Sequence, residues 1–112
     1  MKASVIWWDL GQSTQTIQSL RQYLKEKAVD PWKEIQGMLL KFWISNVEKN
    51  LWGAVMVWQD EKFSKQLLPP NRALELIGYP PVYRFTFDIE AMVEGEHLYE
   101  SFNKLGLIYQ EN

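Results

Sequence analysis

The 112-residue sequence has no cysteine and only one histidine. The lack of cysteine excludes disulfides, thiolate chemistry and the usual structural zinc sites, and one histidine cannot build a histidine-rich metal centre. No apolar run approaches the roughly 18 residues that a membrane-spanning helix needs, and no signal peptide is recognisable. We therefore expect a cytoplasmic protein that does not enter a membrane and holds no metal or other cofactor.

Positive charge is also scarce. Twelve basic residues against 14 acidic ones give a net charge of −2, so the chain offers no field that would attract nucleic acid. Hydrophobic residues are abundant instead, at 46% of the chain, and six of them are tryptophan. A chain of this length buries about two thirds of its unfolded surface. We expect residues 1–112 to form one domain.

The centre of the chain predicts a β-hairpin. Two apolar runs, Met38–Ile44 and Trp52–Trp58, flank the polar segment Ser45–Asn50, which fits a loop of about six residues. A strand with one solvated face alternates apolar with polar residues. Both runs instead have apolar residues on both faces, so we expect both faces of the hairpin to be covered.

Two further strands are indicated. Lys2–Leu10 is again apolar on both faces, and Gly11 ends it. Val82–Asp88 alternates, with aromatic residues on one face and more polar residues, including Arg84 and Asp88, on the other. We expect the more polar face at an interface, where a buried arginine needs a carboxylate partner.

Two helical segments lie between these strands. The first has apolar residues at helical spacing after a cap at Ser13 or Thr14, and ends before Pro31. The second opens at Asp60, is interrupted by two prolines and ends at Gly78, a residue suited to a helix C-terminus.

The order is therefore β-α-β-β-α-β, an α+β chain of the ferredoxin-like type with a four-stranded antiparallel sheet and both helices on one face. The other face still carries large apolar groups, more than a monomer normally exposes. The simplest cover is an identical sheet, so we expect a homodimer. Residues 92–112 form a C-terminal extension that we expect to pack on the core or on the partner.

The spacing of several residues indicates a family. The pattern resembles the YdhR-like mono-oxygenases of the dimeric α/β-barrel superfamily over residues 36–91. It consists of Gly37-x-x-x-Lys41-x-Trp43, Gly53-Ala54, Asp60-Glu61-Lys62 and Phe87-Asp88-Ile89. The resemblance implies two sheets that close a barrel, and kinship with cofactor-independent monooxygenases that oxidise polycyclic aromatic substrates in a cleft between sheet and helices. The chain departs from the family at its longer tail, Pro69-Pro70, Trp52 and Ala54.

Lys41 and Trp43 are the candidate catalytic residues. They share one face of a strand, where the indole can stack on an aromatic substrate and the lysine can stabilise a phenolate or enolate. The structural alternative is that Trp43 fills the core while Lys41 reaches solvent. Candidate substrate-binding residues are Trp7, Trp58 and Tyr83, as walls of the same cleft.

His97 is the only side chain whose unperturbed pKa lies near neutrality, and it is therefore a candidate general base. Its acidic surroundings beyond the last strand favour an exposed histidine instead. Glu96 and Glu100 share a helix face there, but His97 points elsewhere, so we expect no metal site.

Three functions from different classes remain open. The first is a small dimeric oxidoreductase, a monooxygenase acting on an aromatic or quinol-like molecule. The second is a non-catalytic dimer that binds an apolar small molecule or serves as an accessory protein. In the third, the tryptophans fill the interior and the protein is a scaffold.

Overall fold

The structure is a computed structural model that describes residues 1–28, 35–64, 72–93 and 95. The secondary-structure elements follow the predicted order. They are β1 (Lys2–Asp9), a 3-10 turn η1 (Leu10–Gln12), α1 (Ile17–Tyr23), a π-helical continuation η2 (Leu24–Ala28), β2 (Met38–Asn46), β3 (Leu51–Trp58), α2 (Glu61–Ser64), α3 (Arg72–Ile77) and β4 (Tyr83–Asp88).

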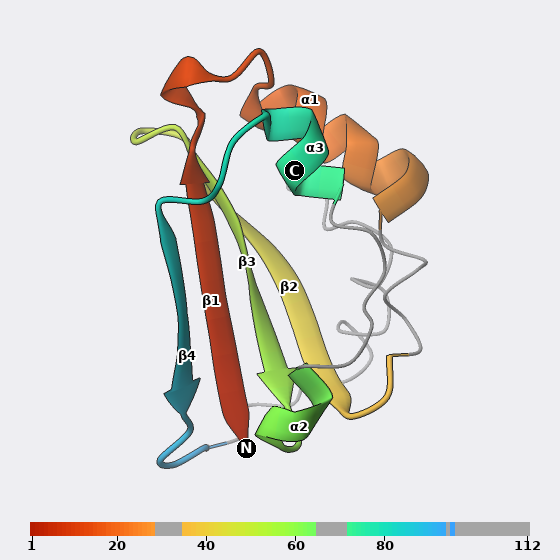
Figure 1. Ribbon diagram of the computed structural model, residues 1–112, viewed down its shortest axis with the longest axis vertical. Coiled ribbons are helices and arrows are strands. Elements are labelled where there is room, and N and C mark those ends of the chain that lie inside the picture. Colours follow the sequence, from red (N-terminus) through yellow and green to blue (C-terminus); the bar gives the residue numbers. More distant parts are fainter. Residues whose placement is uncertain (29–34, 65–71, 94, 96–112) are drawn as a thin grey trace.

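The four strands form one sheet in the order β2-β3-β1-β4, and all neighbours are antiparallel. This α+β arrangement is compatible with the predicted ferredoxin-like fold. Helices α1 and α3 lie together over one end of the sheet, and α2 lies at its other end (Figure 1). We call the side on which α1 and α3 pack the helix face, and the opposite side the open face.

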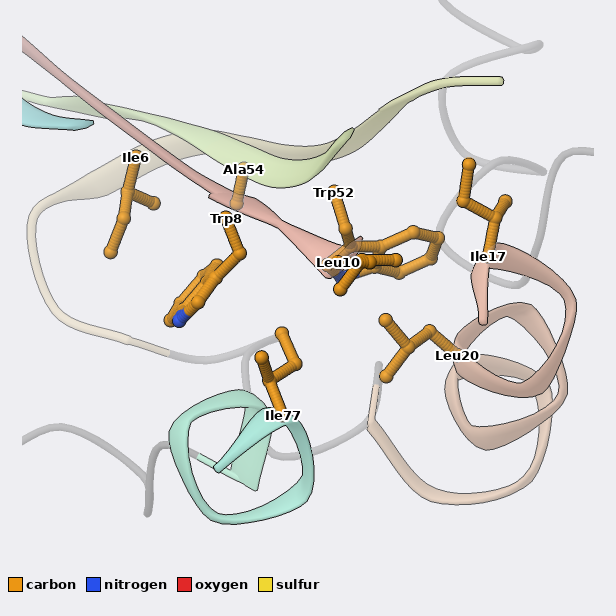
Figure 2. Close-up of a cluster of buried hydrophobic side chains, with 8 residues drawn as sticks. All are labelled: Ile6, Trp8, Leu10, Ile17, Leu20, Trp52, Ala54 and Ile77. Atoms are coloured by element: carbon orange, nitrogen blue, oxygen red, sulfur yellow. The ribbon is translucent and has the colours of Figure 1, made fainter. Parts of the chain in front are cut away.

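The core lies between the helix face and the two upper helices. Side chains of β1 and β3 point toward α1 and α3 in Figure 2. The cluster consists of Ile6, Trp8, Leu10, Ile17, Leu20, Trp52, Ala54 and Ile77. Each large apolar side chain buried here contributes about 1.5–3 kcal/mol, so this cluster holds the helices to the sheet.

Helix α1 starts later than the sequence suggested. Thr16 is its N-cap: the Thr16 hydroxyl accepts from the Ser19 amide at 3.0 Å, and the Ser19 hydroxyl accepts from the Thr16 amide at 2.8 Å. The predicted cap at Ser13 or Thr14 is wrong, because the Ser13 hydroxyl donates instead to the Ile77 carbonyl at 3.0 Å. The predicted end of this helix before Pro31 lies outside the described residues.

The hairpin is confirmed, with longer strands and a tighter turn. The backbones of Asn46 and Leu51 still pair, because ladder hydrogen bonds do not require apolar side chains. The turn over residues 47–50 closes with Asn50 at φ 56°, a left-handed conformation that asparagine tolerates better than most residues. A bulge interrupts β2 between Met38 and Leu40.

Two glycines hold positive φ for different reasons. Gly78 ends α3 as predicted, with φ 97° and its amide donating to the Leu74 carbonyl at 2.9 Å. Gly37 has φ 75°, and a Cβ there would lie 2.1 Å from Cγ of Phe63. The contact with Phe63 joins the start of β2 to α2.

The open face is apolar, and no described helix packs on it. Three transverse rows of its residues contain only glycine, apolar and aromatic side chains. They are Ala3, Val5, Trp7, Leu40, Phe42, Ile44, Gly53, Val55, Val57, Tyr83, Phe85 and Phe87. Phe85 is 58% exposed, Phe87 46% and Phe42 43%.

Arg84 and Asp88 are not on this open face. The register pairs Arg84 with Ile6 and Asp88 with Lys2, which places both on the helix face. We expected the more polar side of β4 to face away from the helices, and this is wrong, since its aromatic side faces away from them. Within the described residues, no helix is long and apolar enough to span a membrane.

Candidate functional site

The sheet register arranges the helix face in transverse rows. The upper row lies toward the end of the sheet that carries the core cluster. It consists of Trp43, Ala54, Ile6 and Arg84. The middle row consists of Lys41, Met56, Ser4 and Thr86. The lower row consists of Met38, Trp58, Lys2 and Asp88.

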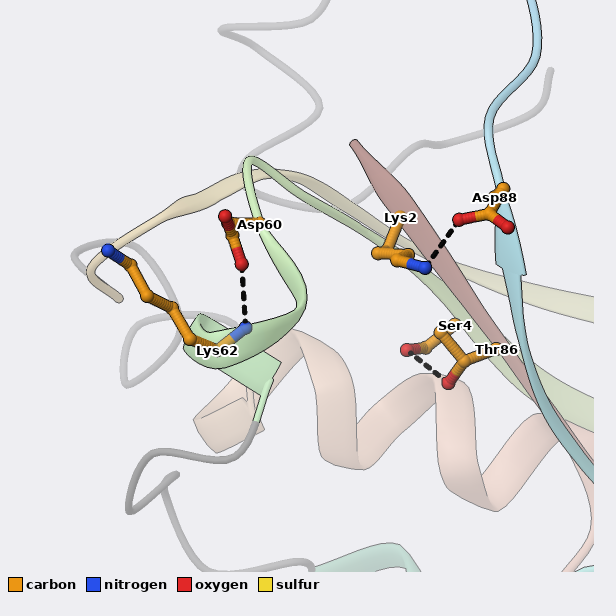
Figure 3. Close-up of polar contacts among 6 residues, drawn as sticks. All are labelled: Lys2, Ser4, Asp60, Lys62, Thr86 and Asp88. Carbon is orange, nitrogen blue, oxygen red and sulfur yellow. Dashed lines mark hydrogen bonds and ion pairs between the residues drawn. The ribbon is translucent and has the colours of Figure 1, made fainter.

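The middle row is the candidate site, because it places polar groups at both ends of an apolar centre. Lys41 stands on β2, Met56 forms the centre, and both are half-buried. On the other side the hydroxyls of Ser4 and Thr86 lie 3.4 Å apart, and either can donate (Figure 3). A planar molecule lying over Met56 would meet an amine at one end and hydroxyls at the other.

The side chain of Lys41 is half-buried beside an aromatic ring. Its Nζ lies 4.7 Å from the centroid of the Trp43 ring, close enough for a cation–π interaction. Burial lowers the pKa of Lys41 from 10.5 to about 7, since removal from water penalises the ammonium form. Near neutral pH the side chain is therefore present both as amine and as ammonium.

Trp43 has two roles in this geometry. Its ring packs against the core cluster, as in the structural alternative given above. The same ring contacts Lys41 from the upper row, so the indole helps to set the position of the amine. The stacking of this indole on a substrate stays a prediction.

Trp58 lies in the lower row and is 1% exposed. Its Nε1 is buried, and no described residue accepts a hydrogen bond from it. In contrast, Nε1 of Trp8 donates to the Tyr79 carbonyl at 2.8 Å. Among the residues of these rows, Trp58 therefore has a donor that the described part of the chain leaves unused.

An ion pair lies at the β4 end of the lower row. Nζ of Lys2 contacts a carboxylate oxygen of Asp88 (Figure 3). The hydrogen bond raises the pKa of Lys2 and lowers that of Asp88. Asp88 therefore pairs with Lys2.

The five predicted site residues do not form one cleft. Lys41, Trp43 and Trp58 lie on the helix face, whereas Trp7 and Tyr83 lie on the open face. The rings of Trp7 and Tyr83 stack on one another, with centroids 3.9 Å apart and planes at 2°. The sequence could not separate them, because β1 is apolar on both faces.

Sequence reasoning missed Ser4, Met56 and Thr86. The sequence offered two signals for the hydroxyl groups. Ser4 is a polar residue inside an apolar strand, and Thr86 is on the more polar side of β4. His97, Glu96 and Glu100 lie outside the described residues. Within the described ranges, no group of three or more histidine, aspartate or glutamate side chains could hold a metal ion.

The sequence was compared with family models and with curated proteins. No family model matches the chain, and no curated protein matches it significantly in sequence. The resemblance to YdhR-like mono-oxygenases therefore stays a prediction from motif spacing.

Proposed function

We propose that the protein is a cofactor-independent oxidoreductase that oxidises an aromatic or quinol-like small molecule on the helix face of its sheet. The observation that carries the proposal is the half-buried Lys41 beside the Trp43 ring, with a pKa of about 7. A general base works best when its pKa lies near the operating pH. The motif resemblance to YdhR-like mono-oxygenases supports the same reaction class.

The chemistry requires only dioxygen as a second reactant. The Lys41 amine takes a proton from an acidic C–H or O–H of the substrate, and the resulting ammonium stabilises the anion. The anion passes one electron to dioxygen, and the radical pair combines to a peroxide. Loss of water from the peroxide leaves a quinone, so that a CH₂ group and O₂ become C=O and H₂O.

The proposal includes a homodimer formed through the open face. An exposed apolar surface of this kind marks an interaction site in soluble proteins. The rows of the open face carry no charge that a partner would have to neutralise, so a second identical face is complementary to it. Two sheets joined in this way would form the α/β barrel that the resemblance implies. We place the dimer in the cytoplasm on the sequence alone.

The second candidate is a non-catalytic dimer that binds an apolar small molecule. It draws on the same aromatic and apolar surface, with Trp43 and Met56 as contacts and Lys41 as a fixed charge. The packing of Trp43 against the core cluster favours this candidate, because the side chain that would contact the ligand is then held rigidly.

Oxygen uptake with a panel of dihydroxynaphthalenes and anthrones tests the proposal. We expect uptake above the buffer rate for the wild type, and a loss of at least tenfold in Lys41→Ala and Trp43→Ala, in the range typical of general bases. Lys62→Ala is the matched control, because Lys62 also lies over an aromatic ring, at 5.1 Å from that of Phe63, but is exposed.

The outcomes separate the candidates. Uptake that is unchanged in Lys41→Ala contradicts the assigned base. Quenching of tryptophan fluorescence by the panel without oxygen uptake favours the non-catalytic binding protein. A wild type that neither consumes oxygen nor binds any member of the panel contradicts both.

A further inference from the structure

Trp8 and Trp58 are buried tryptophans of the helix face, and their indole N–H groups differ in their hydrogen bonding. Trp8 is 3% exposed, and its Nε1 donates to the Tyr79 carbonyl at 2.8 Å. Trp58 is 1% exposed, and among the described residues its Nε1 has no acceptor. Buried donors without acceptors are uncommon in folded proteins and costly. A ligand atom that completes the hydrogen bond is a direct explanation.

The position of Trp58 connects it to Lys41. Met56 is the register partner of Lys41, and Trp58 is the next residue of β3 on the same face. Diagonal neighbours of this kind lie about 7–8 Å apart, within reach of long and aromatic side chains. The amine of Lys41 and the indole of Trp58 therefore belong to one part of the helix face.

We propose that Nε1 of Trp58 donates a hydrogen bond to an oxygen atom of the ligand, a phenol, enol or ketone oxygen, at the site where Lys41 acts. The inference rests on the proposed function for the existence of that site. What it adds to that function is that the ligand carries an oxygen atom able to accept a hydrogen bond. An aromatic ring without an oxygen substituent leaves the indole donor unsatisfied and binds more weakly.

A movement is needed for the ligand to reach this donor, because the nitrogen has no exposed surface. Helix α2 begins three residues after Trp58 and contacts β3. Its described part, Glu61–Ser64, is one turn. Displacement of this turn is the opening step that the proposal implies.

Binding of two probes of similar shape tests the inference. The probes are 1-naphthol, which carries an oxygen, and 1-methylnaphthalene, which has a methyl group in its place. We expect the wild type to bind 1-naphthol about five- to tenfold more tightly, as one buried hydrogen bond warrants. Trp58→Phe removes this preference. Trp8→Phe, the matched control, keeps the preference even though it loses the hydrogen bond to Tyr79.

A second measurement needs no variant. In a ¹⁵N–¹H spectrum of the assigned wild-type protein, 1-naphthol shifts the indole signal of Trp58 downfield, as expected for a new hydrogen bond, while 1-methylnaphthalene does not. The indole signal of Trp8 keeps its hydrogen-bonded position with either probe. This spectrum decides the matter if Trp58→Phe fails to fold.

Each outcome has a distinct meaning. Equal affinities of the wild type for the two probes, or a Trp58 signal that does not respond to bound 1-naphthol, overturns the inference and leaves the site itself intact. Binding of neither probe overturns the site and the inference together. A preference for 1-naphthol without oxygen uptake from any substrate supports the inference and contradicts the proposed oxidation.

Discussion

Trp7 and Tyr83 stack face to face across β1 and β4, with ring centroids 3.9 Å apart and an angle of 2° between the planes. The ring contacts continue along β4, where the ring of Phe85 lies 4.7 Å from that of Tyr83 with the planes tilted by 56°. Gly53 lies opposite Trp7, where a Cβ would come within 2.7 Å of the Trp7 Cβ. These contacts form a continuous aromatic surface on the side of the sheet that no described helix covers.

We predict that a charge in the middle of this surface separates the dimer. Phe85→Asp should sediment as a monomer at micromolar concentrations where the wild type sediments as a dimer, because dimerisation would bury an unpaired carboxylate. Phe85 is 58% exposed in one chain, so the variant should keep its fold and its circular dichroism spectrum.

Val47→Asp is the control for this prediction. Val47 is 70% exposed but lies in the turn between β2 and β3, away from the open face. Its replacement should leave the dimer unchanged. A wild type that sediments as a single chain, or a Phe85→Asp variant that remains dimeric, contradicts the interface.

The lowered pKa of Lys41 predicts a pH-dependent cost to stability. Its pKa is about 7 in the folded protein against 10.5 when unperturbed, so between these values the unfolded chain binds more protons and stability rises with pH. Lys41→Met should therefore stabilise the protein most below pH 7. This advantage should shrink by about 2–3 kcal/mol between pH 6 and pH 9.

Urea unfolding of both proteins across this pH range measures the difference. Comparison with Lys41→Met removes the contributions of the other titrating groups, which both proteins share. A stability difference that stays constant from pH 6 to pH 9 would show that the buried lysine titrates normally.

Gly37 and Gly78 allow a matched test of backbone strain. Both have positive φ, but a Cβ at Gly37 meets the Phe63 ring, whereas a Cβ at Gly78 meets nothing within 4 Å. Gly78→Ala should cost about 1 kcal/mol, the backbone penalty alone. Gly37→Ala should cost about 2–4 kcal/mol, because it also displaces Phe63 and α2. Equal shifts in the urea midpoint would contradict the role of Phe63.

The N-cap of α1 gives a further prediction. Thr16→Ala removes the hydroxyl that accepts from the Ser19 amide, and should destabilise the protein by about 1 kcal/mol. Thr14→Ala should change stability by less than about 0.5 kcal/mol, as for other exposed surface positions. Thermal unfolding of the two variants distinguishes the caps, and a larger loss at Thr14 would contradict the assignment.

The sequence predicted the types of element well, because hydrophobic periodicity and turn residues act locally. The hairpin, the strand over Val82–Asp88 and the helix end at Gly78 all depend on such signals. The first helix cap was misplaced because the Ser13 hydroxyl donates to the Ile77 carbonyl. This is a tertiary contact between residues far apart in the chain.

The sequence could not predict which face of each strand meets the helices. β1 has tryptophan on both faces, at Trp7 and Trp8, and only the helices decide which one is buried. For the same reason, Arg84 was predicted on the wrong face of the sheet, and Trp7 was predicted to share a cleft with Lys41. The adjacency of Lys41 and Trp43 was predictable, because residues two apart in a strand share a face.

The proposed role of Lys41 is that of the base in an oxidation by dioxygen. Its most direct test is the pH dependence of oxygen uptake with anthrone, measured as kcat/KM for the wild type and Lys41→Met and corrected for the reaction in buffer. We predict a wild-type rate that rises through a pKa near 7 and a Lys41→Met rate at least tenfold lower without this inflection. Equal rates, or the same inflection in both proteins, would contradict it.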